Sequence, residues 1–276
     1  MRILAIGLLL LAACDRNASD GAPEIEGAQA ALTYDGSDYQ TDTEKVAHGR
    51  RLAVMLDCTG CHGSNLQGSD LAAKPEDGAM YAPNVTLLVG QYSDPELDKL
   101  IRGGVPKDGR EFWFMPVESY QFLSDADTRA IIAYLRMLTP AGKPLTFVRN
   151  KVFQKEIDQG LIGNAQQQIR KFRSNPPPDL GPKHVVGRYI AQTTCSACHN
   201  SALQGWEGFT PSLDVAGAYS REELTRLLTT GEGKVKKDLG MMSGIARNSF
   251  SKLTPGERDA VVDYVLAYAN RPQRPQ

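Results

Sequence analysis

The chain has 276 residues, a formal net charge of −1 and 23% charged residues. This length accommodates two domains once the N-terminal segment is set aside. The nearly balanced charge gives no indication of nucleic-acid binding and predicts no long-range steering by a field of one sign.

Residues 1–14 have the pattern of a bacterial export signal. Arg2 supplies a positive charge, and residues 3–13 form an apolar stretch too short to span a bilayer. The end of this stretch, Leu11-Ala12-Ala13-Cys14, resembles a lipobox. It predicts removal of residues 1–13 and lipidation of Cys14. The alternative is ordinary cleavage with Cys14 incidental, but a stray thiol is a liability in an oxidising compartment.

These signals predict a protein on the periplasmic face of the bacterial inner membrane, anchored by lipid at Cys14. Asp15 favours retention there, because aspartate after the lipidated cysteine is typical of inner-membrane lipoproteins. No other segment has the apolar run of a transmembrane helix. Residues 14–43 are rich in Asp, Gly, Ala and Ser, which predicts a flexible tether.

The pattern Cys-x-x-Cys-His occurs twice, at Cys58-Thr59-Gly60-Cys61-His62 and at Cys195-Ser196-Ala197-Cys198-His199. This spacing is the attachment signature of c-type haem, in which both cysteines form thioethers and the histidine ligates iron. We therefore predict two covalently bound haem c groups. They are held by Cys58, Cys61, Cys195 and Cys198, with His62 and His199 as iron ligands.

Two other interpretations of the motif fit less well. A structural zinc site needs four ligands, whereas the chain has four histidines in all and no further cysteine near either motif. A thioredoxin-like dithiol follows a strand in a βαβ pattern, whereas each motif here follows a stretch with helical character. Of the five cysteines, four belong to the motifs and the fifth is Cys14.

The two motifs begin an internal repeat. The segment from His62 to Gly68 matches the one from His199 to Gly205, and later matches pair Tyr92-Ser93 with Tyr219-Ser220 and Leu123-Ser124 with Leu253-Thr254. The repeat predicts one domain at 44–143 and another at 183–271. The linker, 144–182, contains three consecutive prolines that favour an extended spacer; whether the part before them packs on a domain is open.

Each repeat is expected to be helical, so we predict an all-α fold. Entry helices are expected near 42–55 and 183–192, middle helices from Ser93 and Ser220, and final helices from Ser124 and Thr254. Capping-box spacing supports three of these starts: Ser220 with Glu223, Ser124 with Asp127, and Thr254 with Glu257. The final helices have apolar residues at helical spacing, at positions 131, 132, 135 and 138 and at 261, 262, 265 and 266.

Gly49 and Gly187 lie inside the two entry helices, where glycine is unfavourable by about 1 kcal/mol relative to alanine. We expect a close helix crossing at each glycine, with Tyr134 and Tyr264 on the partner helices. The alternative is a tolerated surface glycine.

The sixth iron ligand decides between electron transfer and small-molecule chemistry. In the first half the candidates are Met80 and Met115. Met115 follows Phe112-Trp113-Phe114 and precedes Pro116, in a loop between the middle and final helices. We favour Met115 because of this position; Met55 and Met137 fit core positions on helices.

In the second half Met241 and Met242 are adjacent and both lie between the middle and final helices. The repeat does not decide between them because the loop lengths differ. His48 and His184 are alternative ligands, but they lie on the entry helices and we expect both to be surface residues.

A metal-bound histidine usually donates its second ring proton to a fixed acceptor. The carbonyl groups of Pro83 and Pro211 are the candidates, and proline stiffens the loop that carries each of them.

With these residues in place, residues 44 to 270, apart from the linker, resemble class I c-type cytochromes in a tandem dihaem arrangement. They are most similar to the cytochrome subunits of membrane-associated alcohol, aldehyde and gluconate dehydrogenases. The resemblance rests on Cys58 to Gly63, Pro83-Asn84, Met115-Pro116 and Tyr134-Leu135. It implies two tandem class I cytochrome c domains and the proline carbonyl contacts. It also implies Met242 as second ligand, because Ser249 follows at the family's spacing. Those subunits generally carry three haems, whereas this chain has two motifs, so the resemblance implies no particular dehydrogenase partner.

The expected function is electron transfer from a dehydrogenase or other respiratory donor to a terminal oxidase or another cytochrome, and no catalytic residue is expected. One alternative is a dihaem enzyme. A peroxidase needs an open haem, and a thiosulfate-oxidising cytochrome typically has an extra cysteine ligand. Methionine candidates in both halves argue against both enzymes. A further alternative is a structural cytochrome subunit of a respiratory supercomplex.

Overall fold

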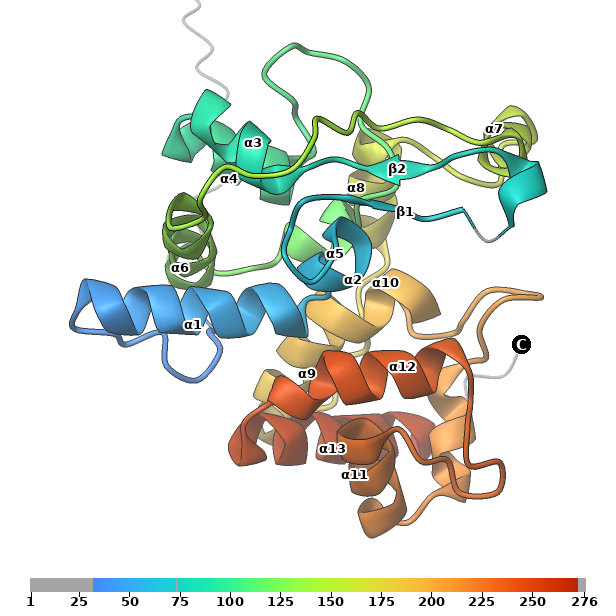
Figure 1. The fold of residues 1–276 in the computed structure, drawn as a ribbon. Helices are drawn as coiled ribbons and strands as arrows, with labels where there is room; N and C mark the ends of the chain where they lie inside the picture. Colours follow the sequence, from blue (N-terminus) through green and yellow to red (C-terminus); the bar gives the residue numbers. More distant parts are fainter. Residues whose placement is uncertain (1–31, 73, 273–276) are drawn as a thin grey trace, which may run out of the picture. The chain divides into compact units, whose positions relative to one another are not determined.

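The computed structural model describes residues 32–72 and 74–272. Within these ranges the chain is mostly helical, which confirms the all-α prediction (Figure 1). Two short strands, β1 (Ser69–Asp70) and β2 (Tyr81–Ala82), pair antiparallel, with Ser69 opposite Ala82 and Asp70 opposite Tyr81. None of the helices in the described ranges is both long enough and apolar enough to cross a membrane.

The first half and the linker contain eight α-helices among the described residues. They are α1 (Asp42–Met55), α2 (Cys58–His62), α3 (Val85–Leu88), α4 (Asp94–Gly103), α5 (Val117–Tyr120), α6 (Asp125–Arg136), α7 (Lys151–Asp158) and α8 (Ala165–Ser174). A short 3-10 turn at Pro75–Asp77 lies between β1 and β2, and another at Val89–Gln91 lies between α3 and α4.

The second half repeats the same order. Its α-helices are α9 (Val185–Ile190), α10 (Ser196–His199), α11 (Arg221–Thr230), α12 (Met241–Asn248) and α13 (Pro255–Ala269). A π-helical turn, Ala191–Cys195, joins α9 to α10 without a break. Three 3-10 turns complete the half, at Pro182–His184, Leu213–Ala218 and Phe250–Lys252.

The close crossings expected at the two glycines are present. A Cβ atom at Gly49 would lie 1.8 Å from the Ala130 carbonyl oxygen of α6, and one at Gly187 would lie 2.1 Å from the Ala260 carbonyl oxygen of α13. No side chain fits in that space. Glycine therefore lets the entry helix of each half pack backbone to backbone on the final helix.

The predicted N-caps of the middle and final helices are confirmed. Ser93, Ser220 and Thr254 cap α4, α11 and α13 with complete capping boxes. Ser124 caps α6 by accepting from the Asp127 amide at 3.0 Å. The carboxylate of Asp127 does not return to the Ser124 backbone, because it is occupied by a buried network.

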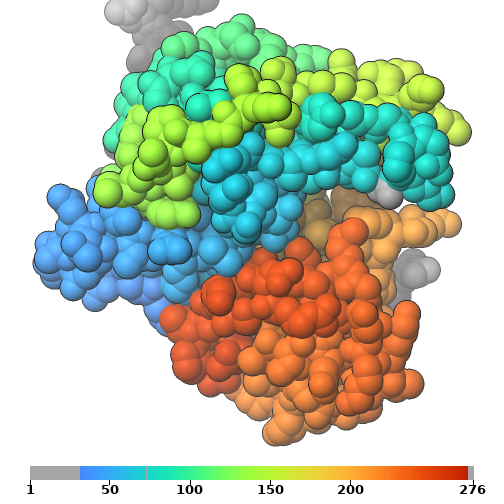
Figure 2. All heavy atoms as spheres, in the orientation of Figure 1, coloured from blue at the N-terminus to red at the C-terminus, as the bar shows by residue number. Residues whose placement is uncertain are grey.

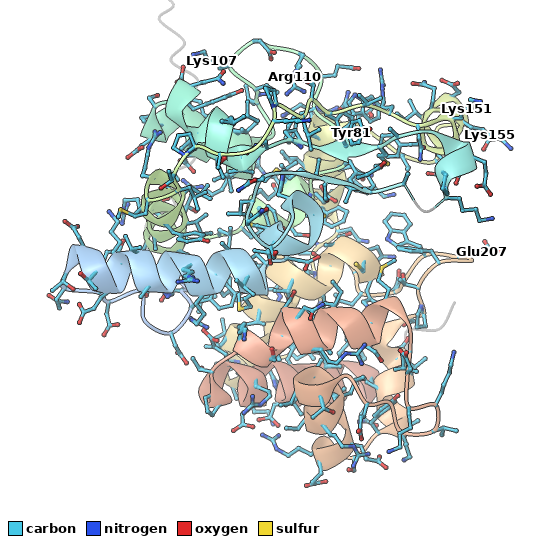
Figure 3. The ribbon with its side chains drawn as sticks, in the orientation of Figure 1. Tyr81, Lys107, Arg110, Lys151, Lys155 and Glu207 are labelled. Carbon is cyan, nitrogen blue, oxygen red and sulfur yellow. The ribbon has the colours of Figure 1, made fainter. Side chains whose placement is uncertain are left out.

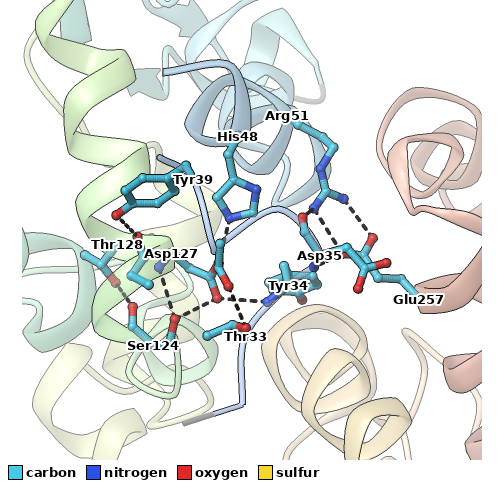
Figure 4. A network of polar contacts seen from close by, with 12 residues as sticks. Thr33, Tyr34, Asp35, Tyr39, His48, Arg51, Ser124, Asp127, Thr128 and Glu257 are labelled. Atoms are coloured by element: carbon cyan, nitrogen blue, oxygen red, sulfur yellow. Dashed lines mark hydrogen bonds and ion pairs between the residues drawn. The ribbon is translucent and has the colours of Figure 1, made fainter. Parts of the chain in front are cut away.

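That network includes residues predicted to be tether (Figure 4). The prediction of a flexible tether is wrong for residues 32–43, while 14–31 lie outside the described residues. Tyr34 is only 1% exposed; its amide donates to Asp127 Oδ2 at 3.1 Å, and its hydroxyl lies 2.5 Å from Thr193 Oγ1. Burial of this aromatic ring, which the polar composition of the segment conceals, fixes the segment to both halves.

Two other sequence-based expectations are wrong. His48 and His184 are buried rather than at the surface, and His48 Nε2 lies 2.8 Å from Asp127 Oδ1. Met137, expected in the core, is 68% exposed, because α6 ends at Arg136 and Met137 is its C-cap. Met55 is buried as expected.

The linker is not a bare spacer. Its helix α8 packs on α5, where Ala165 and Ile169 form a small apolar cluster with Val117, and the Ala165 amide donates to the Phe112 carbonyl at 2.8 Å. Helix α7 buries Phe153, whose ring meets Phe114 edge to face at 5.3 Å. The side chains of Lys151 and Lys155 on α7 are exposed (Figure 3).

Residues just after α6 also return to the first half. Asn84 Nδ2 donates to the carbonyls of Ala141 (2.8 Å) and Lys143 (3.1 Å). In Figure 2 the yellow-green residues of this stretch lie against the teal residues of the first half. The end of the first domain therefore packs on its own half. The part of the linker before the prolines also packs on the first half, through α7 and α8, which answers the question that the sequence left open.

Candidate functional site

The histidines of the two motifs have the same surroundings. His62, at the end of α2, has Nδ1 2.8 Å from the Pro83 carbonyl oxygen, and His199, at the end of α10, has Nδ1 2.8 Å from the Pro211 carbonyl oxygen. A carbonyl oxygen only accepts, so Nδ1 carries the proton in both rings. The Nε2 lone pair of each ring is left for a metal. The contacts expected from the sequence are thus present.

Both imidazoles are held in the neutral form that a metal requires. Burial lowers the pKa of His62 and of His199 below the usual histidine value, and the hydrogen bonds to Pro83 and Pro211 oppose this only in part. Neutral imidazole is the ligand form of histidine. The donor set of each half therefore fits a haem iron.

Backbone contacts fix each motif in the same way. The Gly68 amide donates to the His62 carbonyl, and the Gly205 amide donates to the His199 carbonyl, both at 2.8 Å. The residues that follow the turns repeat the pattern, since Ser69 Oγ donates to the Cys61 carbonyl at 2.5 Å and Thr210 Oγ1 donates to the Cys198 carbonyl at 2.6 Å. The sequence repeat is thus also a geometric repeat.

The four motif cysteines are half-buried. Burial raises the pKa of Cys58 to about 12 and those of Cys61 and Cys195 to about 11, and it raises the pKa of Cys198 as well. Redox-active or nucleophilic cysteines have lowered pKa values instead. This environment argues against a dithiol oxidoreductase and suits cysteines that are consumed in thioether bonds.

The two motifs approach one another. After burial and Asp57, the thiol of Cys198 is a further cause of the raised pKa of Cys61. Helices α2 and α10, which carry the motifs, lie side by side in Figure 1. The apolar cores of the two halves also join into one continuous cluster, which contains Leu52 and Leu135 from the first half and Tyr189 and Val262 from the second.

The methionine candidates of the first half differ in their surroundings. Met115 is half-buried and packs against both the main core and the cluster of α5 and α8. Its backbone is fixed on both sides, because its amide donates to the Trp113 carbonyl (2.9 Å) and its carbonyl accepts from the Val117 amide (2.8 Å). Met80 is buried next to β2. Its backbone is held too, because its amide donates to Asp70 Oδ1 (3.0 Å) and its carbonyl accepts from the Leu71 amide (2.7 Å). Of the two, only Met115 packs against the main core.

The two adjacent methionines of the second half differ clearly in burial. Met241 is 63% exposed, whereas Met242 packs against the core. Both lie in the first turn of α12, so consecutive side chains point in different directions. The sequence alone did not separate them, and the burial favours Met242.

Two contacts around the site were not predicted from the sequence, which pointed to Ser249 only through its spacing from Met242 and did not point to Ser119. Ser119 and Ser249 lie beyond the methionine loops, and their hydroxyls reach Ser196 and Asp57, which flank cysteines of the opposite half. The signal for these contacts was the equal position of the two serines, each five residues before the N-cap of a final helix.

The cytochrome c family model matches residues 46–139 and 185–268, and the chain belongs to this family. Proteins of this family transfer electrons and carry covalently bound haem c. The two matched segments correspond to the two halves of the repeat.

Three curated relatives are similar along most of the chain. The gluconate 2-dehydrogenase cytochrome c subunit of Pantoea cypripedii is 23% identical, over 83% of this chain and 60% of its own length. The fructose dehydrogenase cytochrome subunit of Gluconobacter japonicus is 29% identical, over 80% and 52%. The cytochrome c subunit of the quinone-dependent alcohol dehydrogenase from Gluconacetobacter polyoxogenes is 25% identical, over 70% and 42%. The chain thus spans between about two fifths and three fifths of these relatives.

Proposed function

We propose that the chain is a dihaem electron-transfer subunit that accepts electrons from a dehydrogenase and passes them to a terminal oxidase or another cytochrome. The observation that carries this is the pair of neutral, oriented histidines, each next to two half-buried cysteines. Each half also has a methionine between its middle and final helices that packs against the core. Each haem supplies one-electron redox chemistry at its iron.

The protein residues have separate roles in this proposal. Cys58 and Cys61, and likewise Cys195 and Cys198, attach the two haems. His62 and His199 offer Nε2 to the iron because Nδ1 is held by a carbonyl. Met115 and Met242 would each supply the iron of their half with a second protein ligand and keep small molecules from it, which favours electron transfer over peroxidase chemistry.

The dehydrogenase partner is proposed from the relatives, whose names describe cytochrome subunits of gluconate, fructose and alcohol dehydrogenases. Since this chain spans only part of those proteins, we propose the class of partner and not a substrate. A dehydrogenase releases electrons one pair at a time, and two one-electron sites in one chain suit a donor of this kind.

We also propose a location on the periplasmic face of the inner membrane, with lipid at Cys14. Covalent haem attachment and lipidation both belong outside the cytoplasm, so the two signals agree. A Cys14→Ser variant is expected to leave the membrane fraction and appear in the periplasmic extract. Retention in washed membranes would contradict the anchor without touching the haem proposal.

The test of the function has two parts. Mass spectrometry and the pyridine haemochrome spectrum of the holoprotein should give two thioether-linked haems per chain. The fully reduced protein is then titrated with carbon monoxide, and we expect neither haem to bind at stoichiometric gas. Binding at one haem would show an open sixth position there and move the assignment toward peroxidase-like chemistry.

A further inference from the structure

Ser119 and Ser249 occupy equivalent places in the two halves. Each lies five residues before the N-cap of its final helix, Ser124 or Thr254. Both serines are buried. Neither contacts the motif of its own half through its hydroxyl; each reaches across to the other half.

In the first bridge, Ser119 Oγ lies 2.8 Å from Ser196 Oγ. Ser196 lies between Cys195 and Cys198 of the second motif. Its hydroxyl donates to the Gln192 carbonyl at 2.6 Å. A hydroxyl has one proton to donate, so Ser119 is the donor across the halves.

In the second bridge, Ser249 Oγ donates to Asp57 Oδ1 at 2.9 Å. Asp57 directly precedes Cys58 and has a left-handed backbone, with φ 62°. Its carboxylate lies against the first motif, because a Cβ atom at Gly60 would be 2.4 Å from Asp57 Oδ1. Burial raises the pKa of Asp57, and the Ser249 hydrogen bond acts in the opposite direction.

Each serine is also tied to the methionine loop of its own half. The Ser119 amide donates to the Pro116 carbonyl at 3.0 Å, one residue after Met115. The Ser249 amide donates to the Ile245 carbonyl at 2.8 Å and ends α12, the helix whose first turn contains Met242. Each bridge therefore connects the methionine loop of one half with the cysteine segment of the other.

We propose that Ser119 and Ser249 are positioning residues that couple the two haem sites, each serine fixing the attachment segment of the opposite half. This inference rests on the proposed function, since it assigns a role at the same sites. It predicts a crossed effect: a change in the first half alters the haem environment of the second half, and the reverse. When a serine hydroxyl is removed, its buried partner in the opposite half is left without a hydrogen bond, and the segment that contains this partner shifts.

The test is a potentiometric titration of the full-length holoprotein, monitored through its visible absorption spectrum. Met115→His and Met242→His variants assign the two midpoints, because histidine in place of methionine lowers the potential of its own haem. We expect S119A to shift the midpoint of the second-half haem and S249A to shift that of the first-half haem. Thr128→Val is the control, since Thr128 is buried but its hydroxyl bonds only the Ser124 carbonyl of its own half; it should shift neither midpoint.

A double-mutant cycle distinguishes the loss of the one shared hydrogen bond from independent structural effects of the two substitutions. S196A removes the same hydrogen bond from the other side, together with the bond from Ser196 to the Gln192 carbonyl. S119A/S196A should therefore shift the second-half midpoint no further than S196A alone. S196A also serves if S119A fails to accumulate. The inference is overturned if both midpoints stay unchanged, if each serine variant shifts only its own half, or if the two single shifts add.

Haem content is measured first in every variant. Two attached haems, closed to carbon monoxide, without a crossed shift would overturn the coupling and leave the proposed function intact. A wild-type chain without two attached haems would overturn the function and the coupling together.

Discussion

Asp127 and Glu257 are the third residues of the final helices in the two repeats, and they accept hydrogen bonds from two consecutive backbone amides. The Tyr34 amide donates to Asp127 Oδ2 at 3.1 Å, and the Asp35 amide donates to Glu257 Oε1 at 2.9 Å. Glu257 also accepts from both terminal guanidinium nitrogens of Arg51, at 2.7 and 3.0 Å. A dipeptide ahead of the first helix thus joins the two halves (Figure 4).

This arrangement predicts that D127N and E257Q are destabilising. Each replaces a buried charged acceptor that holds several donors, so we expect the free energy of unfolding to fall by about 2–3 kcal/mol for each. The measurement is guanidinium unfolding of the holoprotein, followed by circular dichroism. Glu44 is the matched control, because it is the third residue of α1 in a similar capping box but is exposed. E44Q should change stability far less; equal effects at all three positions would contradict the network.

The close helix crossings at the two glycines predict a large difference in folding stability among three glycine-to-alanine variants. G49A and G187A place a methyl group about where the Ala130 and Ala260 carbonyl oxygens lie, so each should lose at least about 2 kcal/mol of stability or fail to accumulate. Gly244 in α12 has open space around its Cβ position. G244A should be neutral or more stable by up to about 1 kcal/mol, since alanine is the better helix former. Thermal unfolding of the three variants checks this, and a stable G49A would argue against the close crossing.

The burial difference between Met241 and Met242 predicts opposite results for two neighbouring substitutions. M242A should open the sixth position of the second-half haem, so that the reduced protein binds carbon monoxide at stoichiometric gas. M241A should leave the spectrum and the gas binding as in the wild type. The reverse pattern would assign the ligand to the exposed methionine and require α12 to rotate from its position here.

Glu118 on α5 predicts a pH dependence of stability. Burial raises its pKa from 4.5 to about 7. Between these values the folded state retains a proton that the unfolded state has released, so the free energy of unfolding falls as pH rises from about 4.5 to 7 and then levels off. The full effect is about 3 kcal/mol at most, because a tenfold change in proton affinity corresponds to about 1.4 kcal/mol.

Glu118→Gln is the matched variant, because it keeps the shape and cannot ionise. Denaturant unfolding at several pH values between 4 and 8 should give a wild-type stability that falls relative to the variant across that interval. A constant difference between the two proteins would show that the carboxyl titrates with its ordinary pKa.

Much of the fold follows from local patterns that the sequence displays. Capping residues such as Ser93 and Thr254 fix where helices begin, and their neighbours supply the partners within three residues. The glycines of the entry helices point to crossings because an unfavourable residue inside a helix needs a packing reason. Such signals act over short distances, and the structure confirms them.

The errors concern residues whose burial depends on distant partners. Tyr34 stands in a polar segment, but its place is fixed by Asp127 and Thr193, which lie 93 and 159 residues away. His48 is buried because its ring nitrogen meets the same aspartate. For the site, the motifs identified the cysteines and histidines, whereas the choice between Met241 and Met242 needed the side-chain burial that only the fold supplies.

The two halves reach their cysteines in different ways. Cys58 lies nine positions after Gly49, with a break at Asp57. Cys195 lies eight positions after Gly187, with the π-helical turn Ala191–Cys195 and no break. One residue in a helix corresponds to about 100° of rotation. Exchange of this stretch between the repeats, by recombination within the gene, would turn both cysteines away from their positions. The two entry segments are therefore not interchangeable, although both lead into the same motif.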